Sequence, residues 1–417
     1  MFDGETGFSR RALLHGGMAA GAFVLPRLSG LGDLSAGESS PLRRAKAVIV
    51  LLLEGGMSHL DTWDLKPNAP REIRGEFTQI ATSNPDLRIG EHMPLLAGQA
   101  HLYNVVRSVH SAARNHSPGL HWILTGYDNP RASVNGEKVN RYPSVGSVVS
   151  HELSATSASR LPRFVAVPNR RQLGGRVAYA GANHLGPAHE AFNAGDLPAK
   201  PSGRFVLPAG LTLSKDVDPG RLQDRRALLK SIDRLQRRQE RAAAVETLTG
   251  HQERAFDLLL GERGRAAFDI NREPAQLRAR YGGGRMGQGS LLARRLVEAG
   301  VNFVLVNFSK NNSWDTHKDN FKRLKSRLLP PMDRAVSALL TDLDDRGMLD
   351  ETLVVMLGEM GRTPKINNRG SGGRDHWPDV YSAMLAGGGL YRGKVLGRST
   401  KTGKKPGDRP VHVREVL

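Results

Sequence analysis

Residues 47–53 read Ala47-Val48-Ile49-Val50-Leu51-Leu52-Leu53, and Glu54-Gly55-Gly56 follows directly. A continuous run of branched apolar residues that ends at glycines predicts a strand buried on both faces, as in a parallel sheet. Similar runs predict further strands at 103–109, 164–167, 301–308, 353–357 and 382–386. Helical patterns lie between several of them, and the pattern over 319–346 is interrupted at Pro330-Pro331. The alternation predicts an α/β protein, with a three-layer α/β/α domain around a mostly parallel central sheet.

The composition limits the chemistry more than it limits the fold. The chain has 417 residues, and its 60 Lys+Arg against 41 Asp+Glu give a formal net charge of +19. It contains no cysteine, which excludes disulfides, thiolate metal sites and cysteine nucleophiles. The positive charge predicts an anionic partner, and it leaves open nucleic acid, phosphate or sulfate esters, acidic polysaccharide and lipid headgroups.

The middle of the chain, about 170–290, is predicted to be an insertion or cap of loops and helices on this domain. Residues 170–220 are rich in Gly, Pro and Ala, and 221–241 predict a basic amphipathic helix. Its arginines fit a solvated helix face with i,i+4 charge pairs, or a nucleic-acid or membrane-binding helix. The chain carries no recognised nucleic-acid reader motif, so we expect no specific nucleic-acid partner.

The amino terminus, residues 1–36, resembles a twin-arginine export signal. Arg10-Arg11 precede a short stretch of small apolar residues that ends near Pro26. An amphipathic N-terminal helix is the alternative. No other run approaches the ~20 apolar residues that span a bilayer, so we expect no transmembrane segment. The signal predicts the twin-arginine translocase as a partner during export, and a periplasmic or extracellular location.

Three of the predicted strands are followed at once by side chains that bind metals. They are Glu54, His59 and Asp61 after the first, Asp315 and His317 after 301–308, and Glu359 and then His376 after 353–357. One such cluster alone is more typical of a turn or a helix cap. Three clusters at strand ends favour a divalent metal site, because ligands gather at the carboxyl ends of parallel strands. Carboxylates with imidazoles suit zinc or manganese, with one or two ions.

A fourth segment, Asn115-His116-Ser117-Pro118, follows the predicted strand 103–109. Ser117 is predicted to be the N-cap of a helix whose first residue is Pro118. Its hydroxyl is either a nucleophile favoured by the helix N-terminus or only the cap, and His116 is placed to assist it. Arg362 is a candidate for a bidentate contact to a phosphoryl or sulfuryl oxygen, or for an ordinary ion pair.

Five segments together resemble a bacterial family called domain of unknown function 1501, from about Ala45 to Leu417. They are Glu54-Gly55-Gly56-Met57-Ser58-His59-Leu60-Asp61, Asn115-His116-Ser117, Trp314-Asp315-Thr316-His317, Gly358-Glu359-Met360-Gly361-Arg362-Thr363-Pro364 and Gly373-Arg374-Asp375-His376-Trp377-Pro378. That family is similar in turn to the alkaline phosphatase and sulfatase superfamily. The resemblance implies an alkaline-phosphatase-like domain over 45–417, with paired metals at the carboxyl edge of its sheet.

The resemblance also implies roles by position. It places Ser117 as the nucleophile, and as metal ligands Glu54, Asp315, His317, Glu359 and His376. The chain departs from the superfamily because Glu54 replaces an aspartate and Glu359 lacks an adjacent histidine. No Ser-x-Pro-x-Arg follows a candidate nucleophile, so a formylglycine sulfatase is not expected.

These observations predict an exported, metal-dependent hydrolase of phosphate or sulfate esters, in which Ser117 attacks the ester. The alternative is a non-catalytic exported protein of the same fold that binds acidic glycans or a surface partner.

Overall fold

The computed structural model describes most of the chain from residue 45 onward. The described residues are 45–128, 133–134, 137–138, 141–154, 161–169, 179–208, 211–212, 262–416 and, singly, 218, 220, 221, 224, 227 and 228. The predicted export signal and nearly all of the predicted basic helix 221–241 lie outside them.

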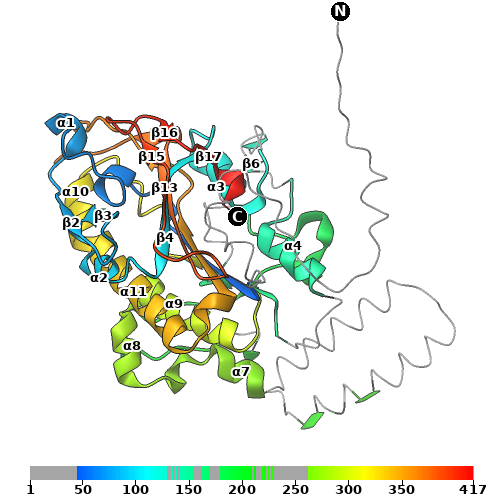
Figure 1. Cartoon of the computed structure of the whole chain (residues 1–417). Coiled ribbons are helices and arrows are strands. Elements are labelled where there is room, and N and C mark those ends of the chain that lie inside the picture. The colour runs from blue at the N-terminus through cyan, green and yellow to red at the C-terminus, as the bar shows by residue number, and fades with distance from the viewer. Residues whose placement is uncertain are drawn as a thin grey trace, which may run out of the picture.

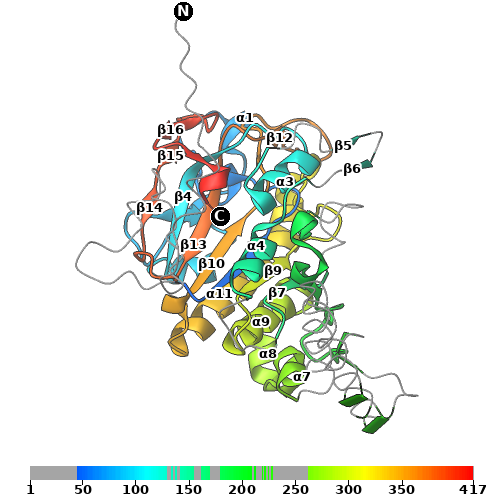
Figure 2. The same cartoon turned by 90° about the vertical axis from the view of Figure 1, so that its right-hand side faces the viewer.

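A single mixed sheet forms the centre of the molecule. Its strands, in spatial order, are β14 (Val395–Leu396), β4 (Tyr103–His110), β13 (Tyr381–Ala386), β10 (Thr352–Leu357), β1 (Ala47–Leu52), β9 (Phe303–Asn307), β7 (Phe164–Val167) and β8 (Phe192–Asn193), with β17 (Val411–His412) also beside β4. Strand β13 pairs antiparallel with both of its neighbours, and the other described pairs of this sheet are parallel. Figure 2 shows the sheet from its face. The predicted strands are confirmed.

Helices cover both faces of the sheet, which confirms the three-layer α/β/α fold. Figure 1 shows α2 (Pro94–Gly98), α8 (Ala275–Tyr281), α9 (Gly284–Glu298) and α11 (Leu329–Asp345) on one side of the sheet, and α3 (His116–Thr125) and α4 (Val145–Glu152) on the other. Side chains of β1 belong to two hydrophobic cores, one on each face of the sheet, as its unbroken apolar run predicts. Ile49 and Leu51 belong to the core under α9 and α11, and Val50 and Leu52 to the core under α3.

The predicted helix 319–346 is not broken at its prolines. Helix α10 (Asn320–Arg323) continues through a π-helical turn, Leu324–Leu328, into α11. Pro330 and Pro331 are the second and third residues of α11, directly after the π turn, where the regular i→i−4 hydrogen bonding that proline cannot join is already interrupted. The π turn and this placement let one long helix pass two prolines.

The region predicted as an insertion includes elements of different kinds. Residues 179–208 form 3-10 turns, irregular loops and β8, which pairs with β7 in the central sheet, and α7 (Glu262–Phe268) and α8 follow in the described chain. Helix α9 lies at the end of this range and packs on the sheet, since a Cβ at Gly289 would lie 3.0 Å from Val306 of β9. Part of the range therefore belongs to the helical layer that covers the central sheet.

Short two-stranded ribbons carry the loops at the sheet edge. They are β2 (Gln79–Ala81) with β3 (Arg88–Gly90), β5 (Ser133–Val134) with β6 (Glu137–Lys138), β11 (Gly361–Arg362) with β12 (His376–Trp377), and β15 (Arg398–Ser399) with β16 (Pro406–Asp408). The remaining short helix, α1 (Arg71–Arg74), precedes β2. The β11–β12 ribbon carries two of the predicted site residues, Arg362 and His376.

Candidate metal centre

The carboxyl ends of four strands bring the predicted site residues to one edge of the sheet. Strands β1, β9, β10 and β4 run in one direction, so the loops that leave them emerge together. Figure 2 shows α3, which follows β4, next to the β11–β12 ribbon. Glycine permits the close approach of these loops. Gly55 has a φ of 111°, and a Cβ there would lie 2.4 Å from the backbone nitrogen of Asp315.

Three imidazoles converge through their Nε2 atoms on the carboxylate of Asp315. The Nε2 atom of His116 is 3.1 Å from Oδ2 of Asp315 and 3.1 Å from Nε2 of His376. Oδ1 of Asp315 lies 3.1 Å from Nε2 of His317 and 3.4 Å from Nε2 of His376. We call these four residues, His116, Asp315, His317 and His376, the candidate metal centre.

The Nδ1 atoms of the same three rings each face an oxygen atom that only accepts hydrogen bonds. The partners are Oε1 of Glu359 at 2.6 Å from His116, Oδ1 of Asp375 at 2.5 Å from His317, and the carbonyl oxygen of Arg114 at 3.0 Å from His376. Each Nδ1 therefore carries the proton, which leaves the Nε2 lone pair of the neutral ring free to bind a metal. A second hydrogen bond of this kind is typical of metal-bound histidine.

The separations also fit a divalent ion. Ligands bound tetrahedrally at about 2.0 Å lie roughly 3.3 Å apart. Ligand atoms of His116, Asp315 and His376 all lie within 4.8 Å of one another, and their closest pairs are 3.1–3.4 Å apart. Nε2 of His317 lies 3.1 Å from Asp315, but His317 is outside this group of three mutually close ligands. The donor set of imidazole nitrogen and carboxylate oxygen is one that a divalent metal accepts.

The charges of the protein alone favour a cation at this place. Burial lowers the pKa of His116, but its hydrogen bonds with Asp315 and Glu359 outweigh burial and raise that pKa to about 9. Burial opposes ionisation of Asp315, but hydrogen bonds from His116 and His376 and the charge of Arg362 hold its pKa well below the usual range. The raised pKa of His116 thus shows that the neighbouring carboxylates favour positive charge at this place, as a bound cation would require.

Glu359 and Glu54 are held by other groups. Both carboxylate oxygens of Glu359 accept the backbone N–H of Gly55, at 2.8 and 3.1 Å, and one of them faces His116. Glu359 thus orients His116. Oε2 of Glu54 accepts a hydrogen bond from Asn307 at 2.9 Å, and Glu54 is not in the group of converging ligand atoms.

Arg362 is fully buried, and its donors are committed to the protein. Nε donates to the carbonyl of Gly56 at 3.0 Å, and Nη2 donates to that of Gly55 and lies 2.5 Å from Oδ1 of Asp315. Nη1 donates to the carbonyl of Arg374 at 3.3 Å. Of the two interpretations of Arg362, the structure contains the ion pair.

Ser117 lies beside the centre but occupies a different helical position from the predicted one. Helix α3 begins at His116, with Asn115 as its N-cap in an extended conformation, so the predicted N-cap at Ser117 is wrong. Pro118 is still in the first turn, where it costs no hydrogen bond. Ser117 hydrogen-bonds Tyr179, whose pKa is raised because burial outweighs this hydrogen bond.

The other predicted metal-binding side chains after β1 lie elsewhere. His59 is fully buried, and its Nε2 lies 3.2 Å from the carbonyl oxygen of Gly403. Asp61 pairs with Arg374, and both side chains are closed to solvent. Sequence reasoning did not assign Asp375, which holds His317. Its position next to His376 was the available signal.

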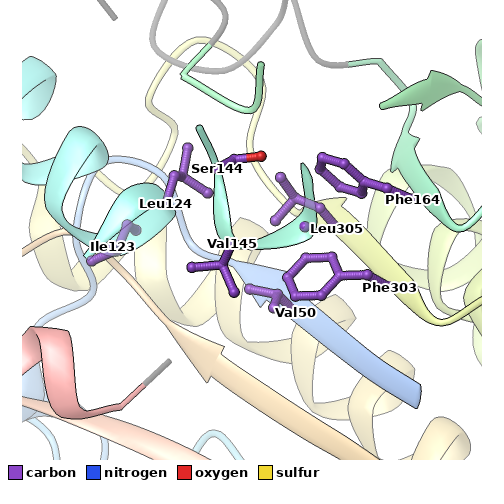
Figure 3. A pocket seen from close by; sticks show the side chains of 9 residues that line it. Val50, Ile123, Leu124, Ser144, Val145, Phe164, Phe303 and Leu305 are labelled. Carbon is purple, nitrogen blue, oxygen red and sulfur yellow. The ribbon is translucent and has the colours of Figure 1, made fainter. Parts of the chain in front are cut away.

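An apolar pocket is found below α3 and α4, against the sheet. Figure 3 shows its lining, which is Val50, Ile123, Leu124, Ser144, Val145, Gly146, Phe164, Phe303 and Leu305. It has no titratable side chain among these residues. The chemistry-bearing groups therefore lie at the sheet edge rather than in this pocket.

The fold and the centre define an α/β protein with a metal-compatible cluster at the carboxyl edge of its sheet. The chain belongs to the family described as protein of unknown function (DUF1501), whose model matches residues 45–417. No curated protein matches the chain by sequence. Among the helices of the described residues, none combines the length and the hydropathy needed to cross a membrane.

Solved structures of several hydrolases are similar to this chain at low identity. The alkaline phosphatase from the Antarctic bacterium TAB5 is 13% identical with a TM-score of 0.36, over 85% of this chain and 95% of that one. The PsFucS1 sulfatase from Pseudoalteromonas sp. is 13% identical with a TM-score of 0.36, over 86% of this chain and 66% of that one. The phosphonate monoester hydrolase SpPMH from Silicibacter pomeroyi is 11% identical with a TM-score of 0.36, over 88% of this chain and 70% of that one.

Proposed function

We propose that this protein is an exported, metal-dependent hydrolase of phosphate or sulfate esters. The observation that carries the proposal is the convergence of three Nε2 atoms and one carboxylate at the candidate metal centre. The four side chains keep 19–32% of their surface exposed, so a substrate oxygen can reach them. Nitrogen and carboxylate donors favour zinc, with manganese as the alternative.

The surroundings of the centre suit an anionic substrate. Exposed cations occur on the loops that carry the centre or lie within one or two residues of its members. They are Arg114, Lys318, Lys365 and Arg369, and the turn Lys401–Lys405 adds three more lysines. That turn is tied to the centre because the indole N–H of Trp377, next to His376, donates to the carbonyl of Lys404 at 2.8 Å. Such a positive rim raises the local concentration of anions.

The proposed reaction would use a bound divalent ion, the hydroxyl of Ser117 and the N-terminal end of α3. A bound divalent ion would supply Lewis-acid stabilisation of charge on the ester oxygens. The Ser117 oxygen would form a bond to phosphorus or sulfur as the bond to the alcohol oxygen breaks, and the serine proton would leave with the alcohol. Water would then cleave the seryl ester and return a proton to Ser117. Ser117 lies in the first turn of α3, so the positive end of the helix dipole would lie near the developing anion.

One observation favours the non-catalytic alternative, a protein that binds acidic glycans or a surface partner. Ser117 hydrogen-bonds Tyr179, and among the described residues no hydrogen bond joins it to the candidate metal centre. The same centre and positive rim would then bind an anion without turnover.

The test is an ester panel with metal-reconstituted protein. The full chain is stripped of metal, reloaded with Zn²⁺ or Mn²⁺ and assayed with p-nitrophenyl phosphate, bis(p-nitrophenyl) phosphate and p-nitrophenyl sulfate. We expect turnover of at least one ester, and a loss of at least about 100-fold in Asp315→Asn and His376→Ala. His151→Ala, at an exposed histidine, is the control. Full activity in Asp315→Asn, or saturable binding of a sulfated glycan with no turnover of any ester, would contradict the hydrolase.

A further inference from the structure

The contacts of Arg362 bear on how many ions the candidate metal centre holds. In the β11–β12 ribbon, Arg362 is the direct cross-strand partner of His376. Residues paired in this way project to the same face of a ribbon. The guanidinium and the imidazole therefore approach the same atom, Oδ1 of Asp315, at 2.5 Å and 3.4 Å.

The guanidinium is fixed in this place. It is closed to solvent, and it donates to the carbonyl oxygens of Gly55, Gly56 and Arg374 as well as facing Asp315. Gly55 and Gly56 have φ angles of 111° and 83°, a conformation that other residues rarely adopt. An arginine side chain keeps its charge in proteins. A permanent positive charge thus lies against the one carboxylate that the three imidazoles share.

The carboxylates near the centre offer few oxygen atoms that could bind a second ion without losing a hydrogen bond. In two-metal sites the ions lie about 3.5–4 Å apart and need separate ligands besides any shared one. Among the described residues, the other carboxylates near the centre already accept hydrogen bonds from N–H groups. Glu359 accepts from Gly55 and His116, Asp375 from His317, and Glu54 from Asn307. A second ion bridged by Asp315 would have to displace Arg362 from Oδ1.

We infer that the centre holds a single divalent ion and that the guanidinium of Arg362 supplies the second positive charge. This inference rests on the metal centre of the proposed function, and it narrows that centre from one or two ions to one. His116, Asp315 and His376 bind the ion, and His317 lies next to Asp315 as a further candidate ligand. Arg362 is a positioning residue, because it holds Asp315 and keeps a second cation away rather than binding substrate.

The test counts ions. The metal-stripped full chain is titrated with Co²⁺ by calorimetry, and the bound metal is measured after dialysis. We expect one ion per chain in the wild type and in Arg362→Lys, which keeps the charge. In Arg362→Gln, Asp315 loses its cation and the position beside Oδ1 opens. We expect a second ion to bind there, with Glu359 exchanging one of its hydrogen bonds for the ion. Electron paramagnetic resonance provides a second readout, since an isolated Co²⁺ and a coupled Co²⁺ pair give different spectra.

Arg323→Gln is the matched control. Arg323 donates to the backbone carbonyls of Asp315 and Ser313 in the same loop, but it does not contact the carboxylate. We expect this variant to bind one ion. Two ions in the wild type would overturn the inference, and so would one ion in folded Arg362→Gln. If Arg362→Gln fails to fold, the wild-type count decides. One ion without ester hydrolysis would refute the proposed function alone, two ions with hydrolysis would refute this inference alone, and no ion would refute both.

Discussion

Arg374 and Asp61 form an ion pair that is closed to solvent on both sides. Nε of Arg374 lies 2.8 Å from Oδ2 of Asp61, and Nη2 lies 3.0 Å from Oδ1. Asn320 donates to Oδ2 of the same carboxylate at 2.9 Å. The pair joins the segment after β1 to the loop that carries His376. Asp61 and Arg374, which belong to the first and last of the five sequence motifs, therefore join two loops at the sheet edge and are not part of the candidate metal centre.

Removal of the negative charge from this pair is expected to destabilise the fold. Asp61→Asn leaves the Arg374 guanidinium buried without its anion, which costs about 3–5 kcal/mol. Urea unfolding measures the loss. Arg392→Gln is the control, because Arg392 and its partners Asp344 and Asp350 are 36–42% exposed and such pairs contribute at most about 1 kcal/mol. Equal losses in the two variants would contradict this account of Asp61.

The stability of the fold is expected to fall in acid because of His59. Burial lowers the pKa of His59 from 6.5 to about 4. The unfolded chain therefore binds this proton first, and stability is lost as the pH falls from 6.5 toward 4. This pKa shift corresponds to a loss of roughly 3 kcal/mol in the free energy of unfolding over that pH window.

The measurement compares unfolding free energies across this window in wild type and His59→Gln. Glutamine keeps a donor for the carbonyl of Gly403 but does not titrate. Other titrating groups are common to both proteins and cancel in the difference. His151→Gln, at an exposed histidine, is expected to keep the wild-type slope. A His59→Gln slope equal to that of the wild type would show that His59 does not titrate in this window.

Glu359, a ligand by sequence prediction, is expected to matter for metal affinity through its hydrogen bond to His116. Its Oε1 accepts the Nδ1–H of His116 at 2.6 Å, and loss of such a partner typically weakens metal binding by 10- to 100-fold. Glu359→Gln should show this loss in a Zn²⁺ titration against a competing chelator. Glu152→Gln, which removes the exposed carboxylate beside His151, should not. Unchanged affinity in Glu359→Gln would contradict the orienting role.

Gly119 tests how closely α3 must approach the centre. A Cβ at Gly119 would lie 3.0 Å from Cβ of Glu359, so Gly119→Ala pushes α3, and His116 with it, away from Asp315. Elsewhere in a helix the same change stabilises by about 1 kcal/mol. We expect Gly119→Ala to lose metal affinity, whereas Gly98→Ala, where nothing lies within 4 Å of the new Cβ, should bind metal as the wild type does. Equal metal affinity in the two variants would show that the loop carrying Glu359 shifts to admit the new Cβ without disturbing the candidate metal centre.

The strands could be predicted because both of their faces are buried. Phe164–Val167 and Thr352–Leu357 are apolar almost throughout, so the pattern needed no knowledge of neighbours. The start of α3 was harder to place, because Asn115 and Ser117 are both common N-caps. The helix begins after the first of them.

The gathering of motifs at one sheet edge was likewise predictable from strand direction. Which side chains face the candidate metal centre, and which hydrogen-bond to other groups, was not predictable. Spacing along the chain does not fix which way the carboxylates of Glu54 and Glu359 turn. In the structure Glu359 turns to the Gly55 N–H and Glu54 to Asn307, while the ring of His116 reaches Asp315 from helix α3. These choices depend on tertiary contacts between segments far apart in the sequence.

The export signal can be separated from its alternative by a substitution that preserves charge. Arg10 and Arg11 lie outside the described residues. An amphipathic helix needs positive charge, which lysine supplies equally, whereas a twin-arginine signal is read through the guanidinium pair itself. We therefore expect Arg10→Lys with Arg11→Lys to retain the protein in the cytoplasm of its host, measured by cell fractionation. Changing Arg43 and Arg44 to Lys, beyond the predicted signal, is the control and should leave export intact. Export of the Arg10/Arg11 double variant at the wild-type level would favour the amphipathic helix, because only the charge would then matter.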